Sequence, residues 1–319
     1  MPEKLIVTPA PHFTTGESIP RIMFTVIAAL VPATLAAVYI FGLKTLGLIV
    51  ACIGAAVLTE VIFQRGRRKK ITVADGSAIL TGLLLALTLP PRFPYIGAIL
   101  GSVAAIALGK QIFGGLGYNI FNPALIGRAF LQATFPVWIT TWERPFTWLS
   151  PKAEAVSTAT PLALMKFEAQ VTSFSKLFWG NVGGSLGETS ALALLLGSIY
   201  LVGKRYIEWR VPVSILGTVG IFGGIFWLIN PEKYPDPIFH ILAGGLILGA
   251  FFMATDPVTM PITARGFWVF GIGTGVLVVI IRLWGGLPEG IMYAILLMNA
   301  FTPIINRYTR PKAFGRERE

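Results

Sequence analysis

The residues of this sequence best suited to chemistry are hydroxyl side chains that cluster between two long apolar regions. Ser157, Thr158 and Thr160 lie within four residues of one another, and Ala159 separates the two threonines. Pro161 restricts the residue before it to extended backbone conformations, so the hydroxyl of Thr160 is expected to be accessible to a modifying enzyme. A turn-rich loop without chemical function has the same composition. The pattern alone therefore leaves both interpretations open.

A second candidate is Arg128, a cation within a long apolar run. A charged side chain at that depth in a membrane is costly unless it is paired. Arg128 is therefore expected to meet either an anionic ligand or a partner subunit, and the sequence favours neither. Asp75, Glu188 and Asp256 fall at the ends of apolar segments, where helix capping and the helix dipole account for them.

The sequence predicts no metal or haem site and no catalytic residue. Cys52 is the only cysteine, and the only histidines are His12 and His240, which fall on opposite sides of the membrane in the topology derived below. The glycines between positions 271 and 275 stop short of a dinucleotide-binding motif. They lie in the middle of an apolar segment, where they predict close packing of helices.

Apolar helices are the elements that must position these residues. The chain has 319 residues, of which 54% are hydrophobic and 13% charged, and its mean hydropathy is +0.72. A soluble domain of this length cannot bury so much apolar surface, and many of the apolar runs are long enough to cross a bilayer. We predict an all-α polytopic membrane protein with about ten transmembrane helices. The predicted segments are 22–41, 45–63, 76–89, 95–113, 122–139, 188–203, 211–229, 238–254, 267–283 and 287–306.

The basic residues predict the orientation of the chain in the membrane. The net charge is +11, but basic and aromatic residues are not interleaved, so nucleic-acid binding is not expected. The cluster from Arg65 to Lys70 follows the second segment, and such clusters resist translocation. Both termini are then cytoplasmic. The expected organisation is a first membrane half at 1–139, an extracytoplasmic loop at 140–187 and a second membrane half at 188–319.

The two membrane halves share residues at fixed offsets. Each half has five predicted segments, and because five is odd, the second half must enter the membrane inverted. Folds built from two inverted five-helix repeats place a ligand or a pathway at the repeat interface near the midplane. One interpretation is therefore a solute channel or transporter without a redox role, with its site near the third and eighth segments. The matching positions are Gly82, Thr88 and Pro90 with Gly249, Thr255 and Pro257, and Gly114, Gly115, Ala129 and Phe130 with Gly285, Gly286, Ala300 and Phe301.

Motifs spread along the whole chain identify a family resemblance. The sequence resembles the RnfD/NqrB family, whose members are membrane subunits of complexes that couple electron transfer to ion translocation. The short N-terminal tail is closer to the RnfD branch. The motifs are Ala10-Pro11-His12, Arg21-Ile22-Met23, Asp75-Gly76, the run from Tyr118 to Ala124, Gly127-Arg128-Ala129-Phe130, the run from Ser157 to Leu162, and Ala254-Thr255-Asp256-Pro257.

The resemblance implies a covalent flavin mononucleotide. In this family the threonine that closes the loop motif carries the flavin through a phosphoester bond made by a flavin transferase, and by position that residue is Thr160. Ser157, Thr158 and Ala159 complete the motif, and Arg128 is a further candidate for binding the cofactor. Thr158 stands where glycine is usual, and an aspartate expected three residues before the serine is replaced by a glutamate at position 154.

The resemblance also implies the partners and the location. We expect a subunit of an Rnf-type translocase complex of the ferredoxin and NAD type, inactive without its partner subunits, in a bacterial cytoplasmic membrane. A second, non-covalent flavin (riboflavin) is expected within the membrane part. The sequence is compatible with either sodium or protons as the translocated ion, because no acidic cluster indicates a dedicated ion site.

Overall fold

The computed structural model describes residues 17–149 and 157–311, and it describes the backbone but not the side chain of Ser157. The motif at residues 10–12, Glu154 and the last eight residues therefore lie outside the described part. The chain begins with two long antiparallel helices, α1 (Ile19–Phe41) and α2 (Lys44–Gly66), each of 23 residues. Such helices are about 35 Å long, enough to cross the apolar part of a bilayer. The turn between them is made by Gly42, whose positive φ of 85° suits a residue without a Cβ.

The rest of the first half consists of shorter helices. η1 (Val73–Asp75) leads into α3 (Ser77–Leu87), and α4 (Tyr95–Ile106) continues into a π-helical turn, η2 (Ala107–Gln111). α5 (Pro123–Thr134) begins at Asn122, whose side chain caps the first backbone N–H groups, and is followed by α6 (Pro136–Ile139). With 11 residues, α3 is about 16 Å long. It therefore crosses only about half of the bilayer.

The polar segment between the two halves forms short helices and strands in its described residues. It contains β1 (Trp142–Glu143), η3 (Thr147–Leu149), β2 (Ser157–Thr158), α7 (Pro161–Glu168) and α8 (Phe174–Trp179). The two strands pair antiparallel, with Trp142 opposite Thr158 and Glu143 opposite Ser157. This small sheet was not predicted.

The second half contains α9 (Ala191–Lys204), α10 (Arg210–Ile229), α11 (Pro237–Leu242), α12 (Leu246–Leu248), η4 (Gly249–Met253), α13 (Ala264–Trp284) and α14 (Ile291–Thr309). The predicted continuous segment 238–254 is wrong, because α11 ends at Leu242 and helix resumes only at Leu246. Gly244 has a positive φ of 71° there, which no helix tolerates.

The membrane class is confirmed. Among the described residues, α1, α2, α10 and α13 are long and apolar enough to cross a membrane, and α3, α4 with η2, and α9 are shorter apolar helices. All ten predicted segments contain helix, but several are too short or too broken to be complete spans.

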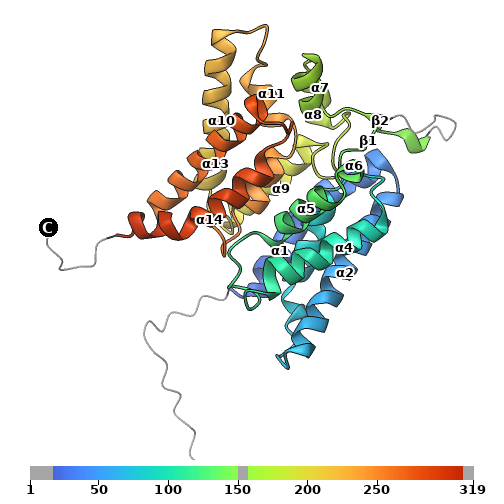
Figure 1. Ribbon diagram of the computed structural model, residues 1–319, viewed down its shortest axis with the longest axis vertical. Helices are drawn as coiled ribbons and strands as arrows, with labels where there is room; N and C mark the ends of the chain where they lie inside the picture. Colours follow the sequence, from blue (N-terminus) through green and yellow to red (C-terminus); the bar gives the residue numbers. More distant parts are fainter. Residues whose placement is uncertain (1–16, 150–156, 312–319) are drawn as a thin grey trace, which may run out of the picture.

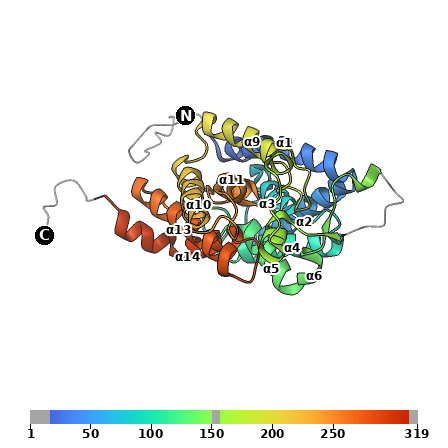
Figure 2. The same cartoon turned by 90° about the horizontal axis from the view of Figure 1, so that it is seen from above.

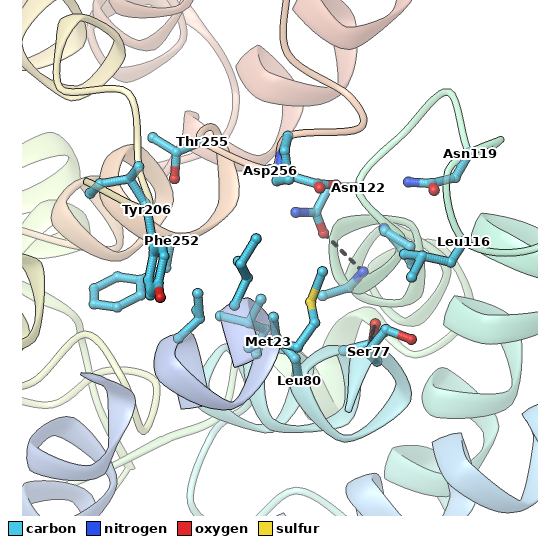
Figure 3. A pocket seen from close by; sticks show the side chains of 18 of the residues that line it. Met23, Ser77, Leu80, Leu116, Asn119, Asn122, Tyr206, Phe252, Thr255 and Asp256 are labelled. Carbon is cyan, nitrogen blue, oxygen red and sulfur yellow. Dashed lines mark hydrogen bonds between the residues drawn. The ribbon is translucent and has the colours of Figure 1, made fainter. Parts of the chain in front are cut away.

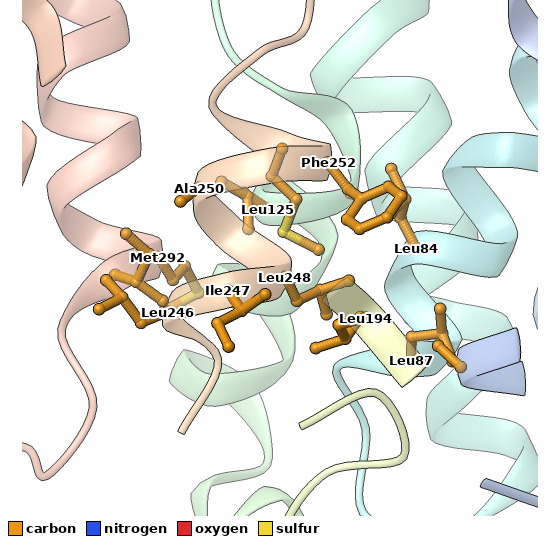
Figure 4. Packing of buried hydrophobic residues seen from close by; sticks show 14 of the residues in the cluster. Leu84, Leu87, Leu125, Leu194, Leu246, Ile247, Leu248, Ala250, Phe252 and Met292 are labelled. Atoms are coloured by element: carbon orange, nitrogen blue, oxygen red, sulfur yellow. The ribbon is translucent and has the colours of Figure 1, made fainter. Parts of the chain in front are cut away.

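The helices pack in two groups (Figure 1). α2 contacts α3 and α4, and α4 contacts α5; in the second half α10 contacts α13, and α13 contacts α14. The groups meet where α1 runs beside α9, as seen from above in Figure 2, and where α5 meets α14. Leucines of α3, α5, α9 and α12 fill the space between the groups, together with Phe252 and Met292 (Figure 4).

Glycines allow the closest helix contacts. A Cβ at Gly197 of α9 would collide with the carbonyl oxygen of Ala29 in α1. Gly271 and Gly275 of α13 face α10 in the same way, so the predicted packing role of this stretch is confirmed.

Candidate functional site

Thr160 is the N-cap of α7. Its backbone is extended, with φ −70° and ψ 157°, as the following proline predicts. Its Oγ1 accepts a hydrogen bond of 3.2 Å from the backbone N–H of Ala163, and Pro161 occupies the start of the helix. The hydroxyl is therefore oriented by the helix start and remains partly exposed.

The strand β2, which precedes Thr160, determines the path of the backbone into Thr160. Thr158 pairs with Trp142 across the small sheet, and its methyl group packs directly on Gly183, where any Cβ would collide with it. The backbone of Ser157 pairs with that of Glu143. Thr158, where the family resemblance leads us to expect glycine, is thus accommodated by a glycine opposite it.

The partner strand is tied to the membrane part by an ion pair. Arg92, in the loop between α3 and α4, contacts Glu143 at 2.9 Å, and the Glu143 side chain is only 10% exposed. Thr147 also donates a hydrogen bond to this carboxylate. These contacts hold β1, and through it β2, against the first half.

Lys166 attaches α7 to the second half of the molecule. Its Nζ donates to three carbonyl oxygens at the end of α13, including those of Ile281 at 3.1 Å and Leu287 at 3.0 Å. A cation is favourable at the C-terminus of a helix because the last carbonyl groups lack intrahelical partners. Burial acts in the opposite sense and lowers the pKa of Lys166 below its ordinary value.

Thr160 opens onto a cavity of about 590 Å³, within the range of small-molecule and cofactor sites. Thr158 and Ala159 line it, and so does Arg128, although 32 residues separate Arg128 from Thr160. The structure therefore brings together the four predicted site residues whose side chains it describes. Ser157 takes part through the backbone pairing of β2.

Arg128 lies at the membrane side of this cavity. It is 8% exposed, and one guanidinium nitrogen donates to the carbonyl oxygen of Thr88, where α3 ends. Glu188 lines the same cavity and lies within the electrostatic influence of Arg128. A guanidinium has five N–H donors. Arg128 thus retains donors beyond this bond, which either of the two predicted partners, an anionic ligand or another subunit, could use.

The sequence did not single out Glu289, which also lines the cavity. Its carboxylate accepts from the backbone N–H of Gly245 at 2.9 Å and from that of Gly290 at 3.0 Å. Arg282, which is 1% exposed, lies 3.2 Å from Glu289 and also donates to the Ala243 carbonyl at 2.9 Å. Arg282 and Glu289 thus satisfy backbone groups at the break between α11 and α12. In the sequence, the position of the cation Arg282 at the edge of an apolar run was the only indication of a buried ion pair here.

A second, smaller cavity of about 70 Å³ lies between the two halves, near the start of α1 (Figure 3). Met23, Leu80 and Phe252 give it an apolar wall. Asn119 and Asn122 add polar groups. The side-chain oxygen of Asn122 caps α5, which the dashed line in Figure 3 marks. That of Asn119 is buried and has no hydrogen-bond partner among the described residues.

The glycines of the predicted midplane site have another use. A Cβ at Gly82 would lie 2.7 Å from the Cα of Ile53, and one at Gly249 would collide with the side chain of Ile291. These two glycines therefore serve close packing, and neither lines the cavity between the halves. In the described ranges, no group of three or more histidine, cysteine or acidic side chains could hold a metal ion.

Comparison with known proteins agrees with the family resemblance. The model of the NQR2, RnfD, RnfE family matches residues 6–315. The chain is 47% identical, over 98% of its length and 96% of the relative, to a subunit of the proton-translocating ferredoxin:NAD(+) oxidoreductase complex of Clostridium ljungdahlii. It is 46% identical, over 98% and 95%, to a subunit of the Na(+)-translocating ferredoxin:NAD(+) oxidoreductase complex of Acetobacterium woodii.

A third relative belongs to the ion-translocating oxidoreductase complex of Stutzerimonas stutzeri and is 42% identical over 94% of this chain and 93% of the relative. The family model matches nearly the whole chain, and the relatives align with it over more than 90% of their own length. The apolar helices agree with a family of membrane proteins. The chain therefore belongs to the NQR2, RnfD, RnfE family of membrane proteins.

Proposed function

We propose that this chain is the flavin-carrying membrane subunit of a complex that couples electron transfer between ferredoxin and NAD to ion translocation. The observation that carries the proposal is the position of Thr160. Its hydroxyl opens, at a helix start, onto a cavity of cofactor size that also contains the buried cation Arg128.

The residues present fit a phosphoester at Thr160. A phosphoryl group on Oγ1 would lie at the N-terminus of α7, where free N–H groups and the helix dipole favour negative charge. Arg128 supplies a positive charge in the same cavity, whose lining also contains the carboxyl groups of Glu188 and Glu289. Flavin mononucleotide attached here would supply electron acceptance and release, for which the chain has no metal-binding cysteine or histidine set of its own. The contacts of Glu143 and Lys166 would hold the attachment point in place.

The second cavity is our candidate for the non-covalent flavin. The unpaired oxygen of Asn119 is a buried acceptor that a ligand N–H group would satisfy. With about 70 Å³ the cavity is smaller than typical ligand sites, so side chains such as Met23 and Leu80 must move to admit a flavin.

We also propose the inverted-repeat architecture, with halves at 1–139 and 188–319 around the loop at 140–187. The contacts of α2, α4 and α5 resemble those of α10, α13 and α14, which supports a repeat. Lys44, at the start of α2, lines the same hollow as Glu143 of β1, whereas Arg67 and Lys69 lie at the opposite end of α2. With the basic cluster cytoplasmic, both termini are cytoplasmic and Thr160 is extracytoplasmic.

The proposal places the chain in a bacterial cytoplasmic membrane, with the other subunits of an Rnf-type complex and a flavin transferase as partners. The names of the relatives include both protons and sodium as the translocated ion.

Peptide mass spectrometry tests the covalent flavin directly. The chain is produced with its flavin transferase, and the mass of the peptide that contains Thr160 is measured in the wild type, in Thr160→Ala and in Thr158→Ala. The expected result is one added flavin mononucleotide in the wild type and in Thr158→Ala, and none in Thr160→Ala. An unmodified wild-type peptide, with an active transferase, would refute the proposal and favour a transporter without a redox role.

A further inference from the structure

A hollow at the end of the molecule where α1 turns into α2 has no part in the proposed flavin site. This outer groove, of about 920 Å³, lies between the α1–α2 turn, the loop before α4 and the segment after β1. Phe41, Leu48 and Phe93 form its buried apolar floor, each 5% exposed or less. Tyr39, Tyr95 and Trp148 stand at its rim and are about half exposed or more.

The rim is held together by specific contacts. The indole N–H of Trp148 donates to the carbonyl oxygen of Tyr39 at 3.2 Å, and its ring lies over Gly42, where a Cβ would come within 2.9 Å of it. The hydroxyl of Tyr95 is 3.4 Å from the carbonyl oxygen of Lys44. Tyrosine and tryptophan are enriched where membrane helices reach the headgroup level. The groove is thus a preformed hollow at that level.

Two cations border the groove. Lys44, at the start of α2, is exposed and has no ion-pair partner in the described part of the chain. Arg92 contacts Glu143, but its side chain is 53% exposed and keeps further N–H donors. With Glu143 as the only acidic residue lining the groove among the described residues, the lining carries a net positive charge.

Exposed apolar side chains follow the groove along α2 and α4. Leu43 and Tyr95 lie in the groove, and deeper along the same helices Val50 of α2 and Ile99 of α4 are exposed at 60% and 42%. A protein that docks on the aqueous side would not need such a surface, whereas an acyl chain requires one.

We infer that the outer groove binds an anionic phospholipid, whose phosphate lies between Lys44 and Arg92 and whose acyl chains lie along α2 and α4. Glu143 then competes with the phosphate for Arg92. Because Glu143 also belongs to β1, the lipid lies directly beside the strand pair that leads to Thr160. The site itself does not depend on the proposed flavin.

Native mass spectrometry of the purified, delipidated complex tests the inference. The complex is titrated with dioleoylphosphatidylglycerol and, separately, with zwitterionic dioleoylphosphatidylcholine. The wild type is expected to bind the anionic lipid at least about tenfold more tightly. Replacing both cations, in Lys44→Gln with Arg92→Gln, is expected to weaken this binding roughly 30-fold, the factor that two basic residues supply at a lipid surface.

Two further variants separate binding from folding. Glu143→Gln removes the competing carboxylate and is expected to tighten binding of the anionic lipid about fivefold, which a merely damaged fold would not do. Lys176→Gln removes an exposed lysine outside the groove and is the matched control, expected to have no effect.

Position is tested with a phosphatidylglycerol that carries a diazirine on its acyl chain. Cross-links are expected on the first turns of α2 and α4. Equal binding of the two lipids would overturn the inference, and so would unchanged binding of the anionic lipid after both cations are replaced. Lipid cross-links on another subunit instead of on α2 and α4, which would indicate that this subunit fills the groove, would overturn it as well.

Discussion

The buried ion pair between Glu60 and Lys110 allows a quantitative prediction. Both side chains are 1% exposed. Nζ of Lys110 lies 2.8 Å from each carboxylate oxygen and 2.6 Å from the hydroxyl of Ser77, and Gln64 and Gln111 donate to the same carboxylate. Lys110→Met leaves a buried carboxylate without its cation, so we expect a loss of about 3–5 kcal/mol in the free energy of unfolding.

The double variant, Glu60→Gln with Lys110→Met, removes both charges and leaves an amide that Gln64 and Gln111 can still contact. We expect it to lose less than the sum of the two single variants, with a coupling free energy of at least about 2 kcal/mol. The assay is an equilibrium titration with sodium dodecyl sulfate in mixed micelles. Cys52, the only cysteine and buried, reports unfolding through its reactivity with a thiol reagent.

Lys70→Met is the control, because Lys70 is exposed at the end of the basic cluster that begins at Arg65. It is expected to change the free energy of unfolding by less than about 0.5 kcal/mol. If Lys110→Met behaves like Lys70→Met, or if the effects of the two single variants simply add, the buried pair does not stabilise the first half as argued.

Three further predictions concern contacts between elements. Lys166→Met removes the three hydrogen bonds that hold α7, so faster hydrogen exchange is expected at residues 161–168, and unchanged exchange would refute this. Gly197→Ala pushes α9 from α1 and is expected to cost about 1–3 kcal/mol in the same unfolding assay, whereas Gly203→Ala, with open space around it, is neutral. The hydrogen bond to Glu17 raises the pKa of Tyr206 above its ordinary value of 10.0. The folded state thus favours the neutral phenol. This contribution to the free energy of unfolding is fully present below the pKa of the unfolded state and is lost as pH rises through the higher pKa of the folded state. Absorbance titration at alkaline pH should show Glu17→Gln lowering this pKa, and no change would contradict the contact.

Local chemistry made several features predictable. The extended backbone of Thr160 follows from Pro161 alone, since the clash that a proline ring imposes acts on its immediate neighbour. The start of α5 at Asn122 and Pro123 follows from capping in the same way. The apolar runs predicted helices because in a membrane every backbone polar group must be satisfied within the segment.

The pairing of β1 with β2 could not be predicted from local chemistry. β1 and β2 are two residues each, too short for an alternating pattern, and they depend on the contact of Glu143 with Arg92, 51 residues earlier in the chain. The break at Gly244 was also missed. An apolar run with two consecutive glycines is equally compatible with a continuous helix, and the buried Arg282 and the partly exposed Glu289 stabilise the break from other elements.

The sequence by itself determined the membrane class, the helical segments and the conformation of Thr160, because these follow from composition and from neighbours a few residues away. Only the tertiary structure decided that Arg128 lies in the cavity of Thr160, that Glu289 lines it and that Gly82 and Gly249 serve packing. Those relations depend on which helix faces meet. That choice is made by close contacts such as Gly197 on Ala29, between residues far apart in the chain.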